Sequence, residues 1–121
     1  MAELAKTSTD ILHEISGLKG VNAIVVVGRD GFVIESEGQI NNSNLDLLGA
    51  SIASAVNSIY EMGAELQMGK FSDLFVNYKN AMIRCFPVGD AICGIAGADS
   101  SALGLIRHKT QKLIPDLERL L

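Results

Sequence analysis

The stretch Gly20–Ser36, GVNAIVVVGRDGFVIES, decides the fold of this chain. Residues 22–28 form a continuous run of small and β-branched residues, which is typical of a strand covered on both faces. Asp30-Gly31 follows, and an Asp-Gly pair between apolar runs indicates a tight hairpin turn. Residues 32–36 alternate between apolar and polar side chains more regularly than residues 22–28 do, as expected of an outer strand. The stretch therefore predicts an antiparallel hairpin whose first strand lies inside a sheet.

The flanking sequence predicts three helices and three further strands from its apolar periodicity. The first helix is expected from the spacing of Leu4, Ile11, Leu12, Ile15 and Leu18, with a stop signal at Ser16-Gly17. The other two helices are expected from Ser43 or Asn44 to about Gln67, and from Ser100 or Ser101 to the end of the chain. Strands are expected over residues 71–78, 81–88 and 91–96. The connections between them are so short that they can form only hairpins. Pro115 is expected to kink or end the last helix near Ile114, because proline removes a backbone hydrogen bond.

The predicted order of elements is α-β-β-α-β-β-β-α, an α/β (α+β) fold. A strand buried on both faces needs helices above and below its sheet. We therefore predict a three-layer α/β/α sandwich around a five-stranded antiparallel sheet, with a profilin-like architecture. No linker, repeat or low-complexity tract interrupts the sequence, so residues 1–121 are predicted to form one domain.

Composition restricts the classes of partner. The chain has a formal net charge of −4 and a pI near 5.0, which argues against nucleic acid or an anionic membrane as the main partner. Its longest apolar run, residues 23–27, is too short to span a bilayer, so no membrane insertion is expected. The first residues lack the apolar core of a secretory signal, and Cys85 and Cys93 are expected to be buried free thiols. These features predict a cytoplasmic protein.

The sequence offers little for catalysis. His13 and His108 have no nucleophile near them in sequence, and no glycine-rich phosphate loop ends in Lys-Ser or Lys-Thr. Gly94 and Gly97 are better explained as small residues of a packed strand than as a phosphate cradle. We therefore expect a non-catalytic protein with no cofactor and no metal site.

The second predicted helix is apolar toward the sheet and almost uncharged on the side facing away from it. Its sheet-facing stripe comprises Leu45, Leu48, Ile52, Val56, Ile59 and Leu66. Between Leu47 and Tyr60 there is no charged residue, although a surface helix normally carries charge on its outer side. The outward stripe comprises Leu47, Ala50, Ser51, Ser54, Ala55, Ser58, Glu61 and Met62. This pattern favours a helix–helix contact between subunits; the alternative is a solvated face of small residues on which nothing packs.

The strand predicted over residues 71–78 adds a second candidate surface. With one paired neighbour it can lie at a sheet edge, and an unprotected edge invites pairing with another chain. Its candidate contact residues are Phe71, Asp73, Phe75 and Asn77. A symmetric dimer that uses this edge and the second helix would cover both surfaces at once.

The pattern of Gly20–Ser36 resembles the roadblock (dynein light chain) family: a glycine, an apolar strand, an Asp-Gly hairpin and a second strand that ends in serine. The order of the later elements also fits, and the last helix is similar to that of the prokaryotic MglB-type members. The resemblance implies homodimers, or heterodimers with a related roadblock chain. In these dimers the third strands join the two sheets and the second helices lie together.

The resemblance further implies that a Ras-like small GTPase binds the paired helices, and that the chain activates, inhibits or only localises it. Any activation would come from reshaping the active site of the GTPase itself. No arginine finger is therefore assigned among Arg29, Arg84, Arg107 and Arg119. The alternative reading is a PAS-like or profilin-like domain that senses a small molecule in a pocket between sheet and helix. The aliphatic core and the scarcity of converging polar groups argue against it.

Overall fold

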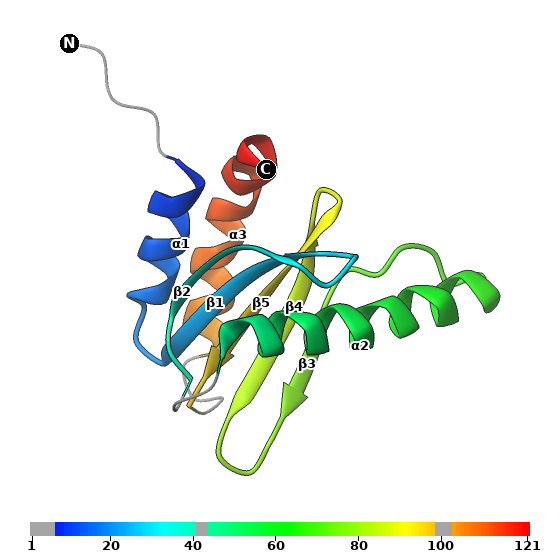
Figure 1. The fold of residues 1–121 in the computed structure, drawn as a ribbon, viewed down its shortest axis with the longest axis horizontal. Helices are drawn as coiled ribbons and strands as arrows, with labels where there is room; N and C mark the ends of the chain where they lie inside the picture. Colours follow the sequence, from blue (N-terminus) through cyan, green and yellow to red (C-terminus); the bar gives the residue numbers. More distant parts are fainter. Residues whose placement is uncertain (1–6, 41–43, 99–102) are drawn as a thin grey trace.

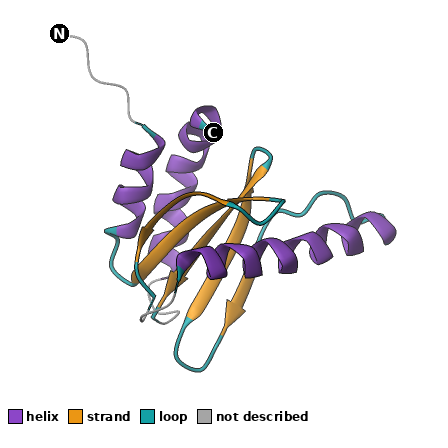
Figure 2. Ribbon diagram, in the orientation of Figure 1, coloured by secondary structure: helices purple, strands orange, loops and turns teal. Residues whose placement is uncertain are grey.

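The computed structural model describes residues 7–40, 44–98 and 103–121. Within these ranges the chain forms three helices and a five-stranded antiparallel sheet, in the predicted order. The elements are α1 (Ser8–Ser16), β1 (Val21–Gly28), β2 (Val33–Gly38), α2 (Leu45–Glu65), β3 (Leu74–Asn77), β4 (Met82–Val88), β5 (Ala91–Gly97) and α3 (Leu103–Leu120). Figures 1 and 2 show α1 and α3 on one face of the sheet and α2 on the other. The predicted three-layer α/β/α sandwich is confirmed.

Strand β1 is covered on both faces, as its continuous apolar run predicts. Ile24 and Val26 belong to the core cluster that includes residues of α1 and α3. Val25 and Val27 belong to a second cluster on the opposite face, which includes residues of α2. The strand order is β2-β1-β5-β4-β3, so the alternating β2 and the short β3 form the two edges. Both edge assignments made from the sequence are confirmed.

Strand β5 lies at the centre of the sheet and is buried along its whole length. A Cβ atom added to Gly94 would lie 2.4 Å from Cδ1 of Ile52, and one added to Gly97 would lie 2.3 Å from the carbonyl oxygen of Gly20. Neither position can therefore carry a larger side chain without movement of its neighbours. The two glycines serve packing, as the sequence analysis expects.

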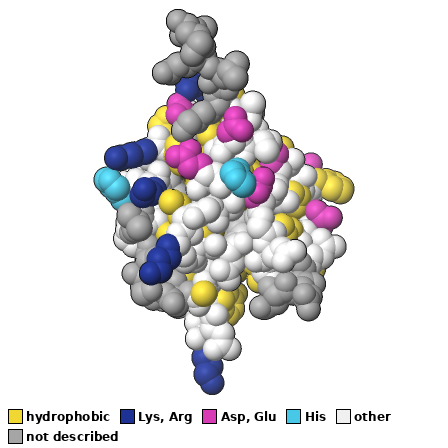
Figure 3. All heavy atoms as spheres, turned by 90° about the vertical axis from the view of Figure 1, so that its left-hand side faces the viewer, with side chains coloured by type: hydrophobic (Ala, Val, Ile, Leu, Met, Phe, Trp, Pro, Cys, Tyr) yellow, Lys and Arg dark blue, Asp and Glu magenta, His cyan; other side chains and the backbone are white. Residues whose placement is uncertain are grey.

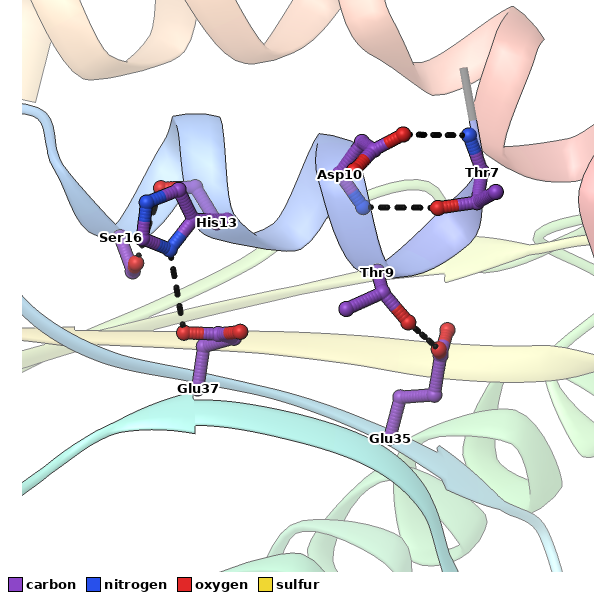
Figure 4. Close-up of polar contacts among 7 residues, drawn as sticks. All are labelled: Thr7, Thr9, Asp10, His13, Ser16, Glu35 and Glu37. Carbon is purple, nitrogen blue, oxygen red and sulfur yellow. Dashed lines mark hydrogen bonds and ion pairs between the residues drawn. The ribbon is translucent and has the colours of Figure 1, made fainter. Parts of the chain in front are cut away.

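Helix α1 is fixed to edge strand β2 by polar contacts (Figure 4). Thr7 caps the helix, since its hydroxyl accepts a hydrogen bond from the Asp10 amide while the Asp10 carboxylate accepts one from the Thr7 amide. The Thr9 hydroxyl donates to Oε1 of Glu35 at 2.7 Å. Part of the predicted first helix lies outside the described residues, as do the predicted starts of the second helix at Ser43 and of the last at Ser100 or Ser101.

Helix α3 runs through Pro115 to Leu120, so of the two outcomes expected at this proline, a kink or an end near Ile114, the end is wrong. Pro115 is exposed, and the carbonyl group of Gln111, which loses its helical donor, belongs to an exposed residue that water can reach. The missing hydrogen bond therefore does not have to be replaced from within the protein.

Helix α2 ends at Glu65, two residues before the predicted end at Gln67. Gln67 has a φ of 55°, in the left-handed region, and the chain turns back there toward the sheet. The last turns of α2 project past the sheet in Figure 1, and the side chain of Leu66 is 59% exposed. The placement of Leu66 in the sheet-facing stripe is therefore wrong, because no strand lies beneath that end of the helix. The centre of the stripe is confirmed, since Ile52 and Val56 are buried.

The close approach of Gly97 to the Gly20 backbone predicts a specific stability difference. Gly97→Ala should lower the free energy of unfolding by about 1–3 kcal/mol, because the backbone carbonyl of Gly20 cannot move as a flexible side chain can. Gly104→Ala is the matched control, because nothing lies within 4 Å of its added Cβ atom. That change should be neutral or stabilising by up to about 1 kcal/mol. Urea denaturation measures both, and equal effects would contradict the packing role.

Candidate functional site

Every residue predicted on the outward face of α2 is exposed in the chain. Asn44 starts the helix, because its Oδ1 accepts a hydrogen bond from the Asp46 amide at 2.8 Å. Leu47 is 67% exposed and Met62 is 48% exposed, and the smaller residues between them are exposed as well. These are Ala50, Ser51, Ser54, Ala55 and Ser58, with Glu61 one residue before Met62. The helix thus presents an exposed face without charge between Asp46 and Glu61.

Edge strand β3 pairs with β4 along one side, and no described strand lies along its other side. The strand covers four residues, shorter than the predicted 71–78. Phe75 packs against the core cluster beneath α1 and α3, and Phe71 meets the Tyr60 ring edge-on at 5.5 Å. Both aromatic rings are thus half-buried by the chain itself, whereas Asn77 is exposed. Among the described residues, β3 therefore has an unpaired strand edge, while the two rings belong to packing within the chain.

An apolar groove joins these two surfaces. It lies between the first half of α2 and the β3–β4 hairpin and has a volume of about 290 Å³. Its walls are formed by Ile40, Asn44, Leu45, Leu47, Leu48, Ser51, Tyr78 and Ile83. Tyr78, whose side chain is 61% exposed, was not among the residues predicted for the site. The signal that could have revealed it is an exposed aromatic residue directly beside a predicted edge strand.

Asp73, a candidate contact residue in the sequence, contacts the buried Arg84 of the same chain. Nε of Arg84 lies 3.1 Å from Oδ1 of Asp73, and Nη1 donates to the Thr110 hydroxyl at 2.8 Å. Thr110 is fully buried in α3, and the Arg84 guanidinium also lies over the Phe86 ring. Arg84, which belongs to β4, therefore links the residue just before β3 to both β4 and α3. Sequence reasoning missed it, although a lone arginine within the apolar strand 81–88 is itself a signal of a buried ion pair.

Arg29 fixes the β1–β2 hairpin to the side of α2 away from β3. Its Nε donates to Oδ1 of Asn57 at 3.1 Å, and Nδ2 of Asn57 donates back to the Arg29 carbonyl at 2.9 Å. The guanidinium also lies 4.2 Å from the centre of the Tyr60 ring. Its side chain thus has partners within the chain.

The other candidate reactive groups are not brought together. His13 is exposed, with Nδ1 3.5 Å from Oε2 of Glu37, and His108 is exposed on α3. The face shown in Figure 3 carries acidic and basic side chains together rather than charge of one sign. In the described ranges no three His, Cys, Asp or Glu side chains are arranged to hold a metal ion. No helix of the described residues is long and apolar enough to cross a membrane.

Cys85 and Cys93 are free and buried, as predicted. Burial, together with the smaller effect of the nearby Asp73 charge, raises the pKa of the Cys85 thiol to about 12. Burial also raises the pKa of the Cys93 thiol, which is completely enclosed. Both sulfurs are therefore neutral thiols near pH 7, which suits a structural role and not a nucleophilic one.

The site and fold together define an α+β domain of the roadblock and profilin-like type, with an exposed helix face beside a free strand edge. The sequence model of the Roadblock/LC7 domain matches residues 7–95. The chain therefore belongs to the Roadblock/LC7 family, and the resemblance noted in the sequence is confirmed.

Solved structures of roadblock proteins share this fold, and two curated relatives match most of the chain in sequence. MglB of Myxococcus xanthus superimposes with a TM-score of 0.85 at 18% identity, covering 93% of each chain. A structure of MglB with tetrameric arrangement gives 0.83 at 17% identity, covering 93% of this chain and 86% of the other. A Roadblock/LC7 domain from Streptomyces avermitilis gives 0.80 at 11% identity, covering 98% and 97%. Two uncharacterized proteins of Methanocaldococcus jannaschii are each 29% identical over 98 residues, 80% of this chain and 84% of each relative.

The buried ion pair predicts that two aspartate–arginine pairs differ in strength. Asp73→Asn should lower the free energy of unfolding by about 1–3 kcal/mol, because it leaves the buried Arg84 without a charged partner. Asp116→Asn is the matched control, since Asp116 pairs with the exposed Arg119. That change should stay within about 0.5 kcal/mol. Urea denaturation compares the two variants, and a small effect at Asp73 would argue against the assigned role of Arg84.

Proposed function

We propose that this chain is a non-catalytic regulator or scaffold that pairs with a second copy, or with a related roadblock chain, and in that form docks a Ras-like small GTPase. The observation that carries the proposal is the exposed, uncharged face of α2, which runs for fourteen residues between Asp46 and Glu61. The proposal places the chain in the cytoplasm, where its two thiols stay reduced.

Self-pairing follows from what the single chain leaves uncovered. Helix α2 packs chiefly on β1, β2 and β5, so Leu74 of β3 and Ile83 of β4 are only half-buried on the same face. Exposed Leu47 and Met62 add further apolar surface that a partner would remove from water. Alanine and serine have little side chain to desolvate and allow a second helix backbone to approach closely. The free edge of β3 supplies backbone donors and acceptors for the same partner.

The small GTPase is proposed from the family. The roadblock resemblance implies this class of partner, and the fold likeness to MglB structures is consistent with it. One of those structures shows MglB in a tetrameric arrangement, so a protein of this fold associates with itself. A second candidate, a small-molecule sensor, is favoured by the groove beside α2. Its volume of about 290 Å³ lies just below the usual range for ligand pockets, and its walls are mainly apolar. A stoichiometric ligand in native mass spectrometry would support this alternative.

Ala55→Arg tests the proposed pairing. Two copies of the new charge would be buried in the proposed helix contact and lose their hydration, so the dimer should dissociate at least a hundredfold more readily. Sedimentation velocity measures the mass. Gln111→Arg is the matched control, because Gln111 is exposed on α3, on the opposite face of the sheet. A monomeric wild-type protein at micromolar concentration would contradict pairing with a second copy.

The same samples test the docking of the GTPase. The wild-type and Gln111→Arg proteins should co-elute with a Ras-like small GTPase from the same organism, while Ala55→Arg should not. The reason is that the proposed docking surface needs two α2 helices. Nucleotide hydrolysis by the GTPase, with and without the chain, then separates activation from inhibition and from simple binding. Failure of the dimeric protein to bind the GTPase in either nucleotide state would overturn this part of the proposal.

A further inference from the structure

A second groove lies between α1 and α3, on the face of the sheet opposite α2. Its volume is about 490 Å³, which is larger than that of the groove beside α2. Its walls come from the second half of α1 with the turn that follows, and from the middle of α3. The lining residues are Glu14, Leu18, His108, Lys109, Lys112 and Leu113. We call this hollow the α1–α3 groove.

The α1–α3 groove opens where α1 ends. Helix α1 spans nine residues and α3 spans eighteen, so α1 covers only part of its neighbour. Gly17 closes α1, since its amide donates to the His13 carbonyl at 3.1 Å. Leu18 and Leu113 pack against the rim of the core cluster and are only half-buried. They provide an apolar floor that the described residues leave accessible.

The α3 wall of the groove is basic. Residues 103–113 include Arg107, His108, Lys109 and Lys112 and no acidic residue, although the whole chain has a net charge of −4. Lys109 and Lys112 lie three residues apart and so project from the same side of the helix. Both are exposed, and neither forms an ion pair with any residue that the structure describes. Figure 3 shows basic side chains gathered at one margin of this mixed-charge face.

We propose that the α1–α3 groove binds an acidic amphipathic segment of a partner protein. The apolar side chains of the segment lie on Leu18 and Leu113, and its carboxylates lie beside Lys109 and Lys112. Glu14 on the opposite wall repels carboxylates, so the acidic side of the segment turns toward α3. This partner differs from the GTPase in chemistry and in site, because α2 and β3 stay uncovered when it binds.

The shape and the charge of the groove favour a protein segment over the two other polyanions. An anionic membrane attracts exposed lysines, but its surface is flat and does not fill a hollow between two helices. The acidic side chains elsewhere on the face in Figure 3 also repel such a membrane. None of the described lining residues is aromatic, so the bases of a nucleic acid have no ring on which to stack. An acidic segment with apolar side chains matches both the floor and the α3 wall.

A designed peptide tests this proposal on the full chain. The probe is a fluorescein-labelled peptide of about sixteen residues, with leucine at every third or fourth position and glutamate between them. The control peptide has glutamine in place of each glutamate. Fluorescence anisotropy should show at least tenfold tighter binding of the glutamate peptide, and added salt should remove the difference because it screens the lysines.

Charge reversal in the chain locates the contact. Lys109→Glu/Lys112→Glu should weaken binding of the glutamate peptide at least tenfold, because it reverses the charge of the α3 wall. Lys70→Glu/Lys79→Glu is the matched control, since it changes the net charge equally at exposed positions that do not line the groove. It should change the affinity less than threefold. In an isotope-labelled chain, the peptide should shift the amide resonances of residues 14–18 and 107–113 and leave those of α2 in place.

Four outcomes would overturn the proposal. They are equal affinity for the two peptides, no binding of either peptide, equal losses in the two double variants, and resonance shifts confined to α2. Vesicles of phosphatidylserine and phosphatidylcholine provide the lipid comparison, and the chain should not sediment with them. Sedimentation that Lys109→Glu/Lys112→Glu abolishes, without peptide binding, would assign the basic wall to a membrane instead. A monomeric wild-type protein that binds the glutamate peptide would contradict self-pairing and support this inference, so the two are tested separately.

Discussion

The structure depends on one constraint: the inner strands of the sheet are apolar on both faces and have to be covered on both. Strands β1 and β5 supply side chains to two separate core clusters. One face is covered by α1 and α3, while in the described part of the chain the other face is covered by α2 (Figure 1). A single helix cannot cover five strands, and α2 lies over β1, β2 and β5. The α2-side face of β3 and β4 is therefore left partly open, and the candidate site lies there.

Residues with one dominant physical role were predictable from the sequence. The apolar run over residues 22–28 can be buried on both faces only inside a sheet. The two core clusters, one on each face, are a direct consequence. The exposed face of α2 was also predictable. A helix that already packs on a sheet normally carries charged residues on its outer side, so a stripe of small uncharged residues there indicates a contact surface. The end of α2 was not predictable, since Leu66 matches the apolar spacing but lies beyond the last strand beneath it. Helical periodicity reports a helix face and carries no information about where the sheet below it stops.

Long-range polar partners were the other feature that sequence patterns could not supply. Asp73 was predicted as a candidate contact residue for another chain, but it is held by Arg84, which also reaches Thr110 in α3. The two partners of Arg84 are 11 and 26 residues away in the sequence, and no local pattern links them. The contact matters for the site, because it fixes the chain immediately before β3. Likewise, Pro115 stays inside a helix because its surroundings are exposed, which a local rule about proline cannot anticipate.

Hydrogen–deuterium exchange as a function of protein concentration tests the central claim that the open side of α2 and the edge of β3 are covered by a second copy. The account predicts that amides of β3 (residues 74–77) and of the middle of α2 exchange more slowly once the concentration exceeds the dimer dissociation constant. Amides of β2, at the opposite edge of the sheet, should exchange at a rate independent of concentration. Exchange in β3 and α2 that does not change with concentration, in a protein shown by its mass to be dimeric, would contradict the account.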